Sequence, residues 1–339
     1  VLGISLMVLG HSGIIDHEIS FIYMFHMPLF FIASGYCFKE KYLSAPQKYI
    51  YNKVKGIYWP YVKWSLLFLL LHNVCFNLHL YSDQYGWKEY VSHLYAPSEF
   101  LSLATSIIFK MQEHEQLLGG YWFMNALFFG SLIVWLVIRY VKQPLCGGAI
   151  LIVICTILNK TCWQIPFINI SSQAFAAGLL IYIGYSLAKY RIKPFNYWQI
   201  ALSLSITLIG SFVWNMAMDQ NSYSNKRFIP YIITAVLASW SFYSLFDKMK
   251  SSHGICAKAL DFIGKNTLTI LTWHFLAFKL VSLLIIGVYG LPIERLAEFP
   301  VITEYSQQGW WIVYFIVAMV VTCGIAYCNK WIINNWLKL

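Results

Sequence analysis

Long apolar runs separated by short polar segments recur along the whole chain. A membrane-spanning helix needs about 20 apolar residues, so runs near that length predict spans and the polar segments between them predict loops. The runs predict ten spans, at residues 1–13, 21–38, 57–78, 119–140, 145–158, 172–188, 198–217, 228–246, 267–289 and 310–331.

A further apolar run, residues 100–109, is too short to span a bilayer and ends in the polar sequence MQEHEQ. This pattern predicts an interfacial or re-entrant helix within the longest polar region, residues 81–116, on the outer side. That region is long enough to cap a cavity and too short to be a second domain. The sequence therefore predicts a single integral-membrane domain over residues 1–339.

Composition indicates the same class of protein. Of the 339 residues, 59% are hydrophobic and 11% are charged, whereas a soluble domain carries about 25% charged residues. We therefore expect an all-α polytopic membrane protein with about ten transmembrane helices. The sequence opens at Val1, without a methionine and already inside an apolar run, so we expect a fragment that lacks its true N-terminus.

The distribution of charge predicts the orientation. One set of alternate loops, with the C-terminal tail, holds 16 of the 24 Lys and Arg residues and three of the 14 Asp and Glu residues. Basic residues are enriched in cytoplasmic loops, so this set, and both termini, are expected to be cytoplasmic. The net charge of +10 is spread over these loops, which favours an anionic membrane surface and predicts no nucleic-acid partner.

The first two predicted spans each carry one histidine, His11 and His26, on either side of a polar bend at residues 16–20. If both spans are straight antiparallel helices, the two imidazoles lie level, about 11 Å inside the bend. Ionisable groups inside a membrane are costly and mark functional sites by default, and histidine acts as a general base near neutral pH. The equally weighted alternative is a histidine satisfied by a neighbouring helix or by headgroup water.

Small residues and a proline surround these histidines. Gly10 lets another group approach the first helix closely, and Pro28 is expected to loosen the second helix just beyond His26. Ser34 and Gly35 form a small patch suited to close helix packing. A kinked packing helix explains the second segment as well as a site does, and the level position of the two histidines favours the site.

Further polar candidates lie toward the inner side. Lys53 and Lys55 precede the third span, where basic residues bind phosphates of a soluble donor or of lipids; ordinary positive-inside anchoring is favoured over that role by about two to one. Asn266 is expected to cap the ninth span. His274 lies about two turns further on, nearer the cytoplasmic face than His11, and either lines a passage from that face or hydrogen-bonds across helices.

The remaining reactive residue types match no known motif. The eight cysteines are scattered and read as small buried side chains, so neither a disulfide framework nor a zinc site is expected. Glu113 and Glu115 are expected to be solvated. Four further histidines match no metal-binding spacing such as HExxH, and no metal is predicted for them: His72, His79, His93 and His114.

Five segments, taken together, resemble motifs of the integral-membrane acyltransferase 3 family, especially its fucose-4-O-acetylase-like branch. They are LMVLGH ending at His11, FHMPLFFIASGY from Phe25, basic residues before Pro60 and Tyr61, YWF from Tyr121, and IGKNTLTILTWH ending at His274. They follow the family order and, with the ten spans, cover nearly the whole chain. In combination they are specific for the family rather than for a substrate.

The resemblance implies an acyltransferase that moves an acyl group, often acetyl, from cytoplasmic acyl-coenzyme A to a hydroxyl of a cell-envelope glycan or lipid-linked sugar. It implies a multi-pass protein of a bacterial-type inner (cytoplasmic) membrane, in contact with the lipid bilayer. His11 would be the base or the acyl carrier, with His26 orienting it or sharing its proton. For the donor it implies, at the phosphates and in the inner vestibule, Lys53, Lys55, Asn266 and His274.

The chain departs from the family pattern at two places. The family's basic residue ten positions ahead of the first histidine would lie one position before Val1, and arginines are more usual where Lys53, Lys55 and Gly56 stand. The alternative function is a transporter or exporter of a surface polysaccharide or its precursor, and a lipid-binding structural component is a third. A transporter is expected to show two related halves with interrupted helices; the absence of such internal symmetry favours the enzyme.

Overall fold

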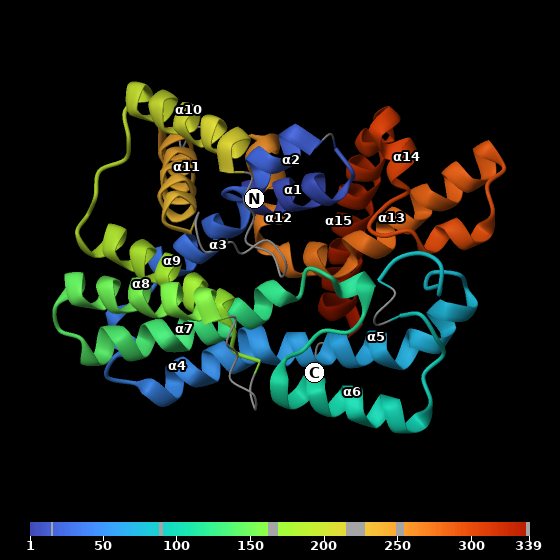
Figure 1. Ribbon diagram of the computed structural model, residues 1–339, viewed down its shortest axis with the longest axis horizontal. Helices are drawn as coiled ribbons and strands as arrows, with labels where there is room; N and C mark the ends of the chain where they lie inside the picture. Colours follow the sequence, from blue (N-terminus) through green and yellow to red (C-terminus); the bar gives the residue numbers. More distant parts are fainter. Residues whose placement is uncertain (15, 88–90, 162–168, 215–227, 249–253, 337–339) are drawn as a thin grey trace.

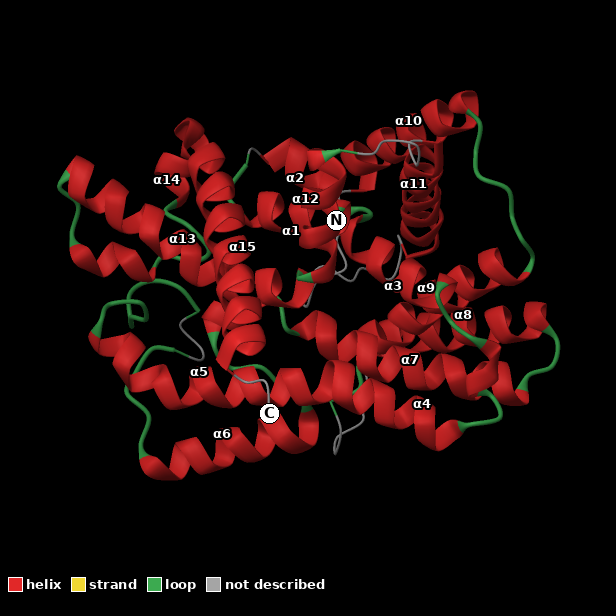
Figure 2. Cartoon of the chain, turned by 180° about the vertical axis from the view of Figure 1, so that it is seen from behind, coloured by secondary structure: helices red, strands yellow, loops and turns green. Residues whose placement is uncertain are grey.

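The computed structural model describes residues 1–14, 16–87, 91–161, 169–214, 228–248 and 254–336, and within these ranges it contains helices and loops but no strand (Figure 2). The all-α prediction is confirmed. Elements labelled η are 3₁₀ helices, except η2 and η5, which are π-helices. In chain order the elements are α1 (Leu2–His11), α2 (Asp16–Tyr23), α3 (His26–Tyr36), η1 (Glu40–Tyr42), α4 (Pro46–Lys53), η2 (Val54–Tyr58), α5 (Trp59–Asn77), α6 (Pro97–Lys110), η3 (Gln116–Leu118), α7 (Trp122–Tyr140), α8 (Pro144–Thr161), α9 (Ser172–Lys189), α10 (Tyr197–Trp214), α11 (Phe228–Lys248), α12 (Ile255–Lys265), α13 (Thr267–Tyr289), η4 (Ile293–Ala297), α14 (Thr303–Tyr305), η5 (Ser306–Trp310) and α15 (Trp311–Trp336).

Several helices have the length and composition of membrane spans. Four qualify among the described residues: α7, α11, α13 and the run Thr303–Ile332 that contains α15. Shorter apolar helices cover Leu2–His11, Pro144–Leu158 and Tyr197–Val213. The protein is therefore a helical membrane protein, and the count of ten spans and the cytoplasmic termini stay predictions.

Helices α4, η2 and α5 follow one another without a break, so the expected loop carrying Lys53 and Lys55 is helical. Helix α7 lies against the first part of this long helix and α6 lies beside α5 (Figure 1). The Tyr49 hydroxyl donates to the Ser131 carbonyl at 3.0 Å, and the Tyr58 hydroxyl donates to the Ile108 carbonyl at 2.8 Å. The predicted short helix at residues 100–109 is thus present as α6, and its C-terminal end lies against η2.

The second predicted span is interrupted. Residues 16–20, expected as a bend, begin helix α2. This helix ends at Tyr23, and residues 24 and 25 are not helical before α3 starts at His26. At the break Phe25 leaves the helical region with φ −141°, and His26 Nδ1 donates to the Ile22 carbonyl at 3.0 Å. Pro28 falls in the first turn of α3, where its missing N–H has no helical partner to lose. The proline therefore lies in the first turn of a helix and does not loosen one.

Two glycines set the crossing of α3 and α9. A Cβ at Gly35 would overlap the carbonyl oxygen of Ile181, and a Cβ at Gly184 would overlap that of Ile32. The backbones touch directly, as small residues permit between membrane helices. The predicted close packing at Gly35 is confirmed. Helix α9 also packs on α7, so it connects α3 to α7.

We predict that Gly35→Ala destabilises the protein by about 1–3 kcal/mol, because the added methyl group forces α3 and α9 apart. The matched control is Gly287→Ala on α13, where a Cβ would meet nothing within 4 Å. Thermal unfolding in detergent micelles checks both variants. Equal unfolding temperatures for Gly35→Ala and Gly287→Ala would contradict the direct backbone contact.

Candidate functional site

Three histidines from separate helices lie near one another, and two of them are in contact. His11 ends α1, His26 begins α3, and His274 lies in the first half of α13. The Nδ1 atom of His11 is 3.1 Å from Nε2 of His274, and the two ring planes are nearly parallel, with centroids 5.3 Å apart and an interplanar angle of 16°. Their hydrogen bond joins residues 263 positions apart in the chain.

The rings of His11 and His274 are in direct contact, and the expectation that His274 lies nearer the cytoplasmic face stays a prediction. Of the two roles left open for His274, a hydrogen bond across helices is the one observed. Its ring is fully buried, with 0% exposure, and lies against Phe275, whose centroid is 3.9 Å away. The Phe275 ring also packs on His11, with the two ring centroids 4.9 Å apart.

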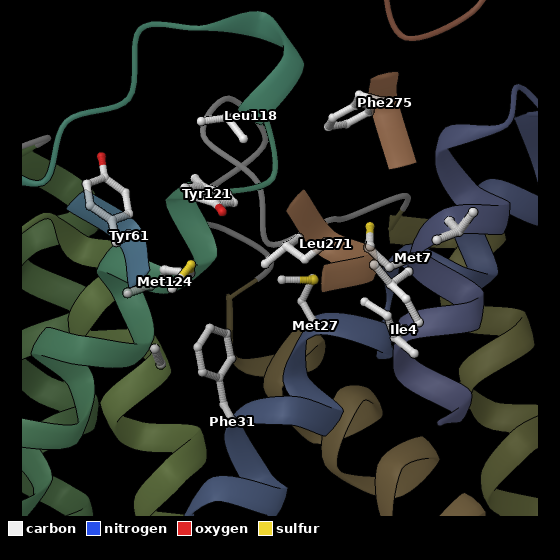
Figure 3. Packing of buried hydrophobic residues seen from close by; sticks show 14 of the residues in the cluster. Ile4, Met7, Met27, Phe31, Tyr61, Leu118, Tyr121, Met124, Leu271 and Phe275 are labelled. Carbon is white, nitrogen blue, oxygen red and sulfur yellow. The ribbon is translucent and has the colours of Figure 1, made fainter. Parts of the chain in front are cut away.

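His11 and His26 line one cavity of about 300 Å³. Its other walls are mostly apolar, and Figure 3 shows Met27 and Leu271 close together, with Met7 and Ile4 beside them on α1. Such a volume is at the lower end of the range for small-molecule sites, which combine apolar walls with a few polar groups. We call this first cavity the chamber. The predicted pair of histidines lines it, although the helix predicted over residues 21–38 is interrupted before His26.

Tyr23 lies between the two cavity histidines. Its ring centroid is 6.5 Å from that of His11 and 5.1 Å from that of His26. The Tyr23 hydroxyl donates to the Gly10 carbonyl at 3.2 Å, and a Cβ at Gly10 would lie 2.7 Å from the Tyr23 ring. The close approach predicted at Gly10 is confirmed, and the approaching group is this tyrosine.

The predicted donor-side lysines lie next to the cavity rather than on it. Lys53 lines a second cavity of about 320 Å³, and Ile57 lines both cavities. Burial lowers the pKa of Lys53 to about 8. Lys55 is exposed, with its ammonium 6.0 Å from the centroid of the Tyr51 ring. Of the residues that directly follow Lys55, Gly56 and Ile57 line the first cavity.

Asn266 does not cap α13 with its side chain. The amide Nδ2 donates to the Phe262 carbonyl at 2.7 Å, so it closes the end of α12. Asn266 is the N-cap residue of α13, as predicted, but its side chain bonds the Phe262 carbonyl because the preceding residues are helical. The next two residues, Thr267 and Leu268, line the first cavity.

A buried polar cluster in the segment after α6 escaped the sequence reasoning. Glu115 is fully buried, and its Oε1 atom lies 3.1 Å from Nδ1 of His72. Glu113 accepts from the Ser65 hydroxyl at 2.7 Å and from the backbone N–H groups of His114 and Glu115. The expectation of solvated carboxylates is wrong. Two acidic residues directly after an apolar helix, and a histidine inside an apolar run, were the available signals.

We predict that Glu113→Gln flattens part of the pH dependence of stability. Burial raises the pKa of Glu113 to about 7 from an ordinary 4.5. Between these pH values the folded protein keeps a proton that the unfolded chain has lost. The stabilisation is complete below about pH 4.5 and is lost as the pH rises through 7. The measurement is the thermal unfolding midpoint of both proteins from pH 5 to 8.

His114 provides the control of opposite sign. Burial lowers the pKa of His114 to about 4, so its contribution is complete above about pH 6.5 and is lost as the pH falls through 4. His114→Gln should therefore alter the acid side of the profile, and Glu113→Gln the neutral side. Superimposable profiles for wild type and Glu113→Gln would contradict a buried, proton-binding carboxyl group.

The fold and the chamber define a helical membrane protein with a mostly apolar cavity lined by two histidines. The chain belongs to the acyltransferase 3 family: the family model, described as an acyltransferase domain, matches residues 1–329. The protein is therefore a membrane acyltransferase. No curated protein and no solved structure matches the chain. The fucose-4-O-acetylase-like branch stays a prediction.

Proposed function

We propose that the protein transfers an acyl group, acetyl being the first candidate, from cytoplasmic acyl-coenzyme A to a hydroxyl of a cell-envelope carbohydrate. The supporting observation is the chamber shared by His11 and His26. Proton transfer by a positioned histidine is the chemistry that such an acyl transfer needs. A bacterial-type inner membrane, and one domain over residues 1–339, complete the proposal.

In the proposed reaction His11 takes the proton of the acceptor hydroxyl while the oxygen bonds to the thioester carbonyl carbon. The carbon–sulfur bond breaks, and the thiolate of coenzyme A takes the proton from His11. In the variant with an acyl-histidine, the His11 ring carries the acyl group before the hydroxyl attacks. His26 faces the same chamber as a second proton acceptor.

The donor would enter beside η2. Gly56 and Ile57 of η2 and Thr267 of α13 line the chamber, and Ile57 also lines the neighbouring cavity that contains Lys53. An ammonium group binds phosphate as a point charge, so Lys53 is the better placed of the two lysines for a coenzyme A phosphate. Exposed Lys55 is left to the membrane surface or the outer part of the nucleotide.

The test uses the full chain in lipid nanodiscs with ¹⁴C-acetyl-coenzyme A and isolated envelope glycans. We expect alkali-labile label in the glycan. Gly56 lines the chamber, and a Cβ there would meet nothing within 4 Å. Gly56→Leu should therefore raise the KM for the donor, because the leucine side chain occupies space that the donor would enter. The control is Gly287→Leu, which also faces open space but lies outside the chamber. Glycan that crosses the membrane without label would support the transporter instead.

A further inference from the structure

The hydrogen bonds of His274 determine which of its nitrogens carries a proton. Its Nδ1 atom is 2.9 Å from the Leu271 carbonyl oxygen and 3.2 Å from the Ile270 carbonyl oxygen, both on its own helix. A carbonyl oxygen only accepts, so Nδ1 must be the donor. In the neutral ring the other nitrogen, Nε2, then carries a lone pair and can only accept.

That lone pair faces His11. The atom 3.1 Å away is His11 Nδ1, which must therefore carry the proton of this bond. The remaining nitrogen of His11, Nε2, is left as its basic atom, on a side chain that lines the chamber. A histidine used as a base needs this arrangement, with one nitrogen held as a donor so that the other is free to accept.

A charged His274 would reverse the bond, and the surroundings disfavour it. The ring has 0% exposure, and among the described residues no carboxylate forms an ion pair with either His11 or His274. The neighbours of the pair are Phe275, Phe278 and Tyr23. An unpaired charge buried among such groups is strongly unfavourable.

His26 does not take this role. Its Nδ1 donates to the Ile22 carbonyl at 3.0 Å, and its closest aromatic neighbour is Tyr23. The described structure contains no hydrogen bond between His26 and His11. The two cavity histidines are therefore held independently, and the group that orients His11 comes from α13.

We propose that His274 is the positioning residue of this acyltransferase: through its Nε2 lone pair it holds the Nδ1–H tautomer of His11 and directs the basic Nε2 of His11 toward the reacting hydroxyl. The inference about the tautomer comes from the histidine contacts alone, and its catalytic consequence rests on the proposed function. Selecting the correct tautomer of a catalytic histidine accounts for factors of up to about 10⁴ in kcat in enzymes with a comparable bond.

The test compares His274→Phe, His274→Gln and His26→Gln in the full chain. Phe keeps the ring volume without an acceptor, whereas the Gln side chain reaches as far as Nε2 and offers an amide oxygen. We expect His274→Phe to lower kcat by about 10²–10⁴ with little change in the KM for the donor. His274→Gln should recover most of this loss and keep the wild-type pH profile of kcat/KM, since an acceptor suffices.

A second readout does not depend on turnover. In ¹⁵N-histidine solid-state NMR spectra, His11 Nδ1 should have the shift of a protonated nitrogen and His11 Nε2 that of an unprotonated one, in wild type and in His26→Gln. In His274→Phe this preference should be lost. If glycan acylation fails while the tautomer is as expected, the proposed function is wrong and the contact stands. Wild-type kcat and spectra in His274→Phe, or a His274→Gln protein as inactive as His274→Phe, would overturn the inference.

Discussion

Replacing His11 by glutamine should lower kcat for acyl transfer by at least about a hundredfold, while the KM for acyl-coenzyme A and the unfolding temperature change little. The amide cannot accept the hydroxyl proton, and general base catalysis contributes about 10²–10⁴ to such rates. The partly exposed position of His11 at the end of α1, on the wall of the chamber, leaves the core of the protein intact.

The measurement is a steady-state rate with ¹⁴C-acetyl-coenzyme A in nanodiscs, and His26→Gln is the matched comparison. His26 lines the same chamber but has no hydrogen bond to His11 in the described structure. We therefore expect a smaller loss of kcat for His26→Gln than for His11→Gln. Acyl transfer that survives both substitutions would rule out the histidine mechanism.

The second large effect is on folding. Truncating Glu115 to alanine should destabilise the protein by about 3–5 kcal/mol, because it leaves His72 buried without its partner. Both side chains have 0% exposure. His72 is also held by the His93 carbonyl at 3.0 Å and by Tyr95, whose ring lies 3.4 Å away centroid to centroid.

Thermal unfolding followed by tryptophan fluorescence checks this prediction. His93→Gln is the control, because it removes the exposed pair between His93 and Glu99 while the His93 carbonyl remains. That variant should unfold near the wild-type temperature, since exposed ion pairs contribute little. Replacing both His72 and Glu115 by apolar residues should recover much of the loss. An unchanged unfolding temperature for Glu115→Ala would show that the pair is not buried in solution.

The site was predictable in part from single segments. His11 and His26 stand out because an ionisable group within an apolar run needs a partner or a function, and Gly10 and Gly35 indicated close contacts that the structure contains. The depth argument paired two histidines that do line one cavity, although it assumed one straight helix over residues 21–38. The helix is interrupted at Phe25, and the two histidines still line one chamber.

The contacts that no segment could predict are those between distant helices. His274 meets His11 because α13 crosses α1, and loop spacing carries no information about crossing. The buried pair of His72 and Glu115 depends on α6 lying beside α5, which returns the following segment to the interior. Lys53 and Lys55 were expected in a loop before a span but lie inside the continuous helix of α4, η2 and α5. Neither lines the chamber, because that depends on the direction each side chain takes around the helix.

The amino-acid sequence by itself determined the all-helical membrane class and the family. It also singled out the two histidines of the first two apolar runs as candidate site residues. These follow from composition, run length and local motif, which are properties of neighbouring residues. Only the tertiary structure decided which histidine holds His11 and which acidic side chains are buried. Hydrogen bonds between helices depend on their crossing and rotation, and these are set by packing such as the glycine contact of α3 with α9 rather than by any single run of residues.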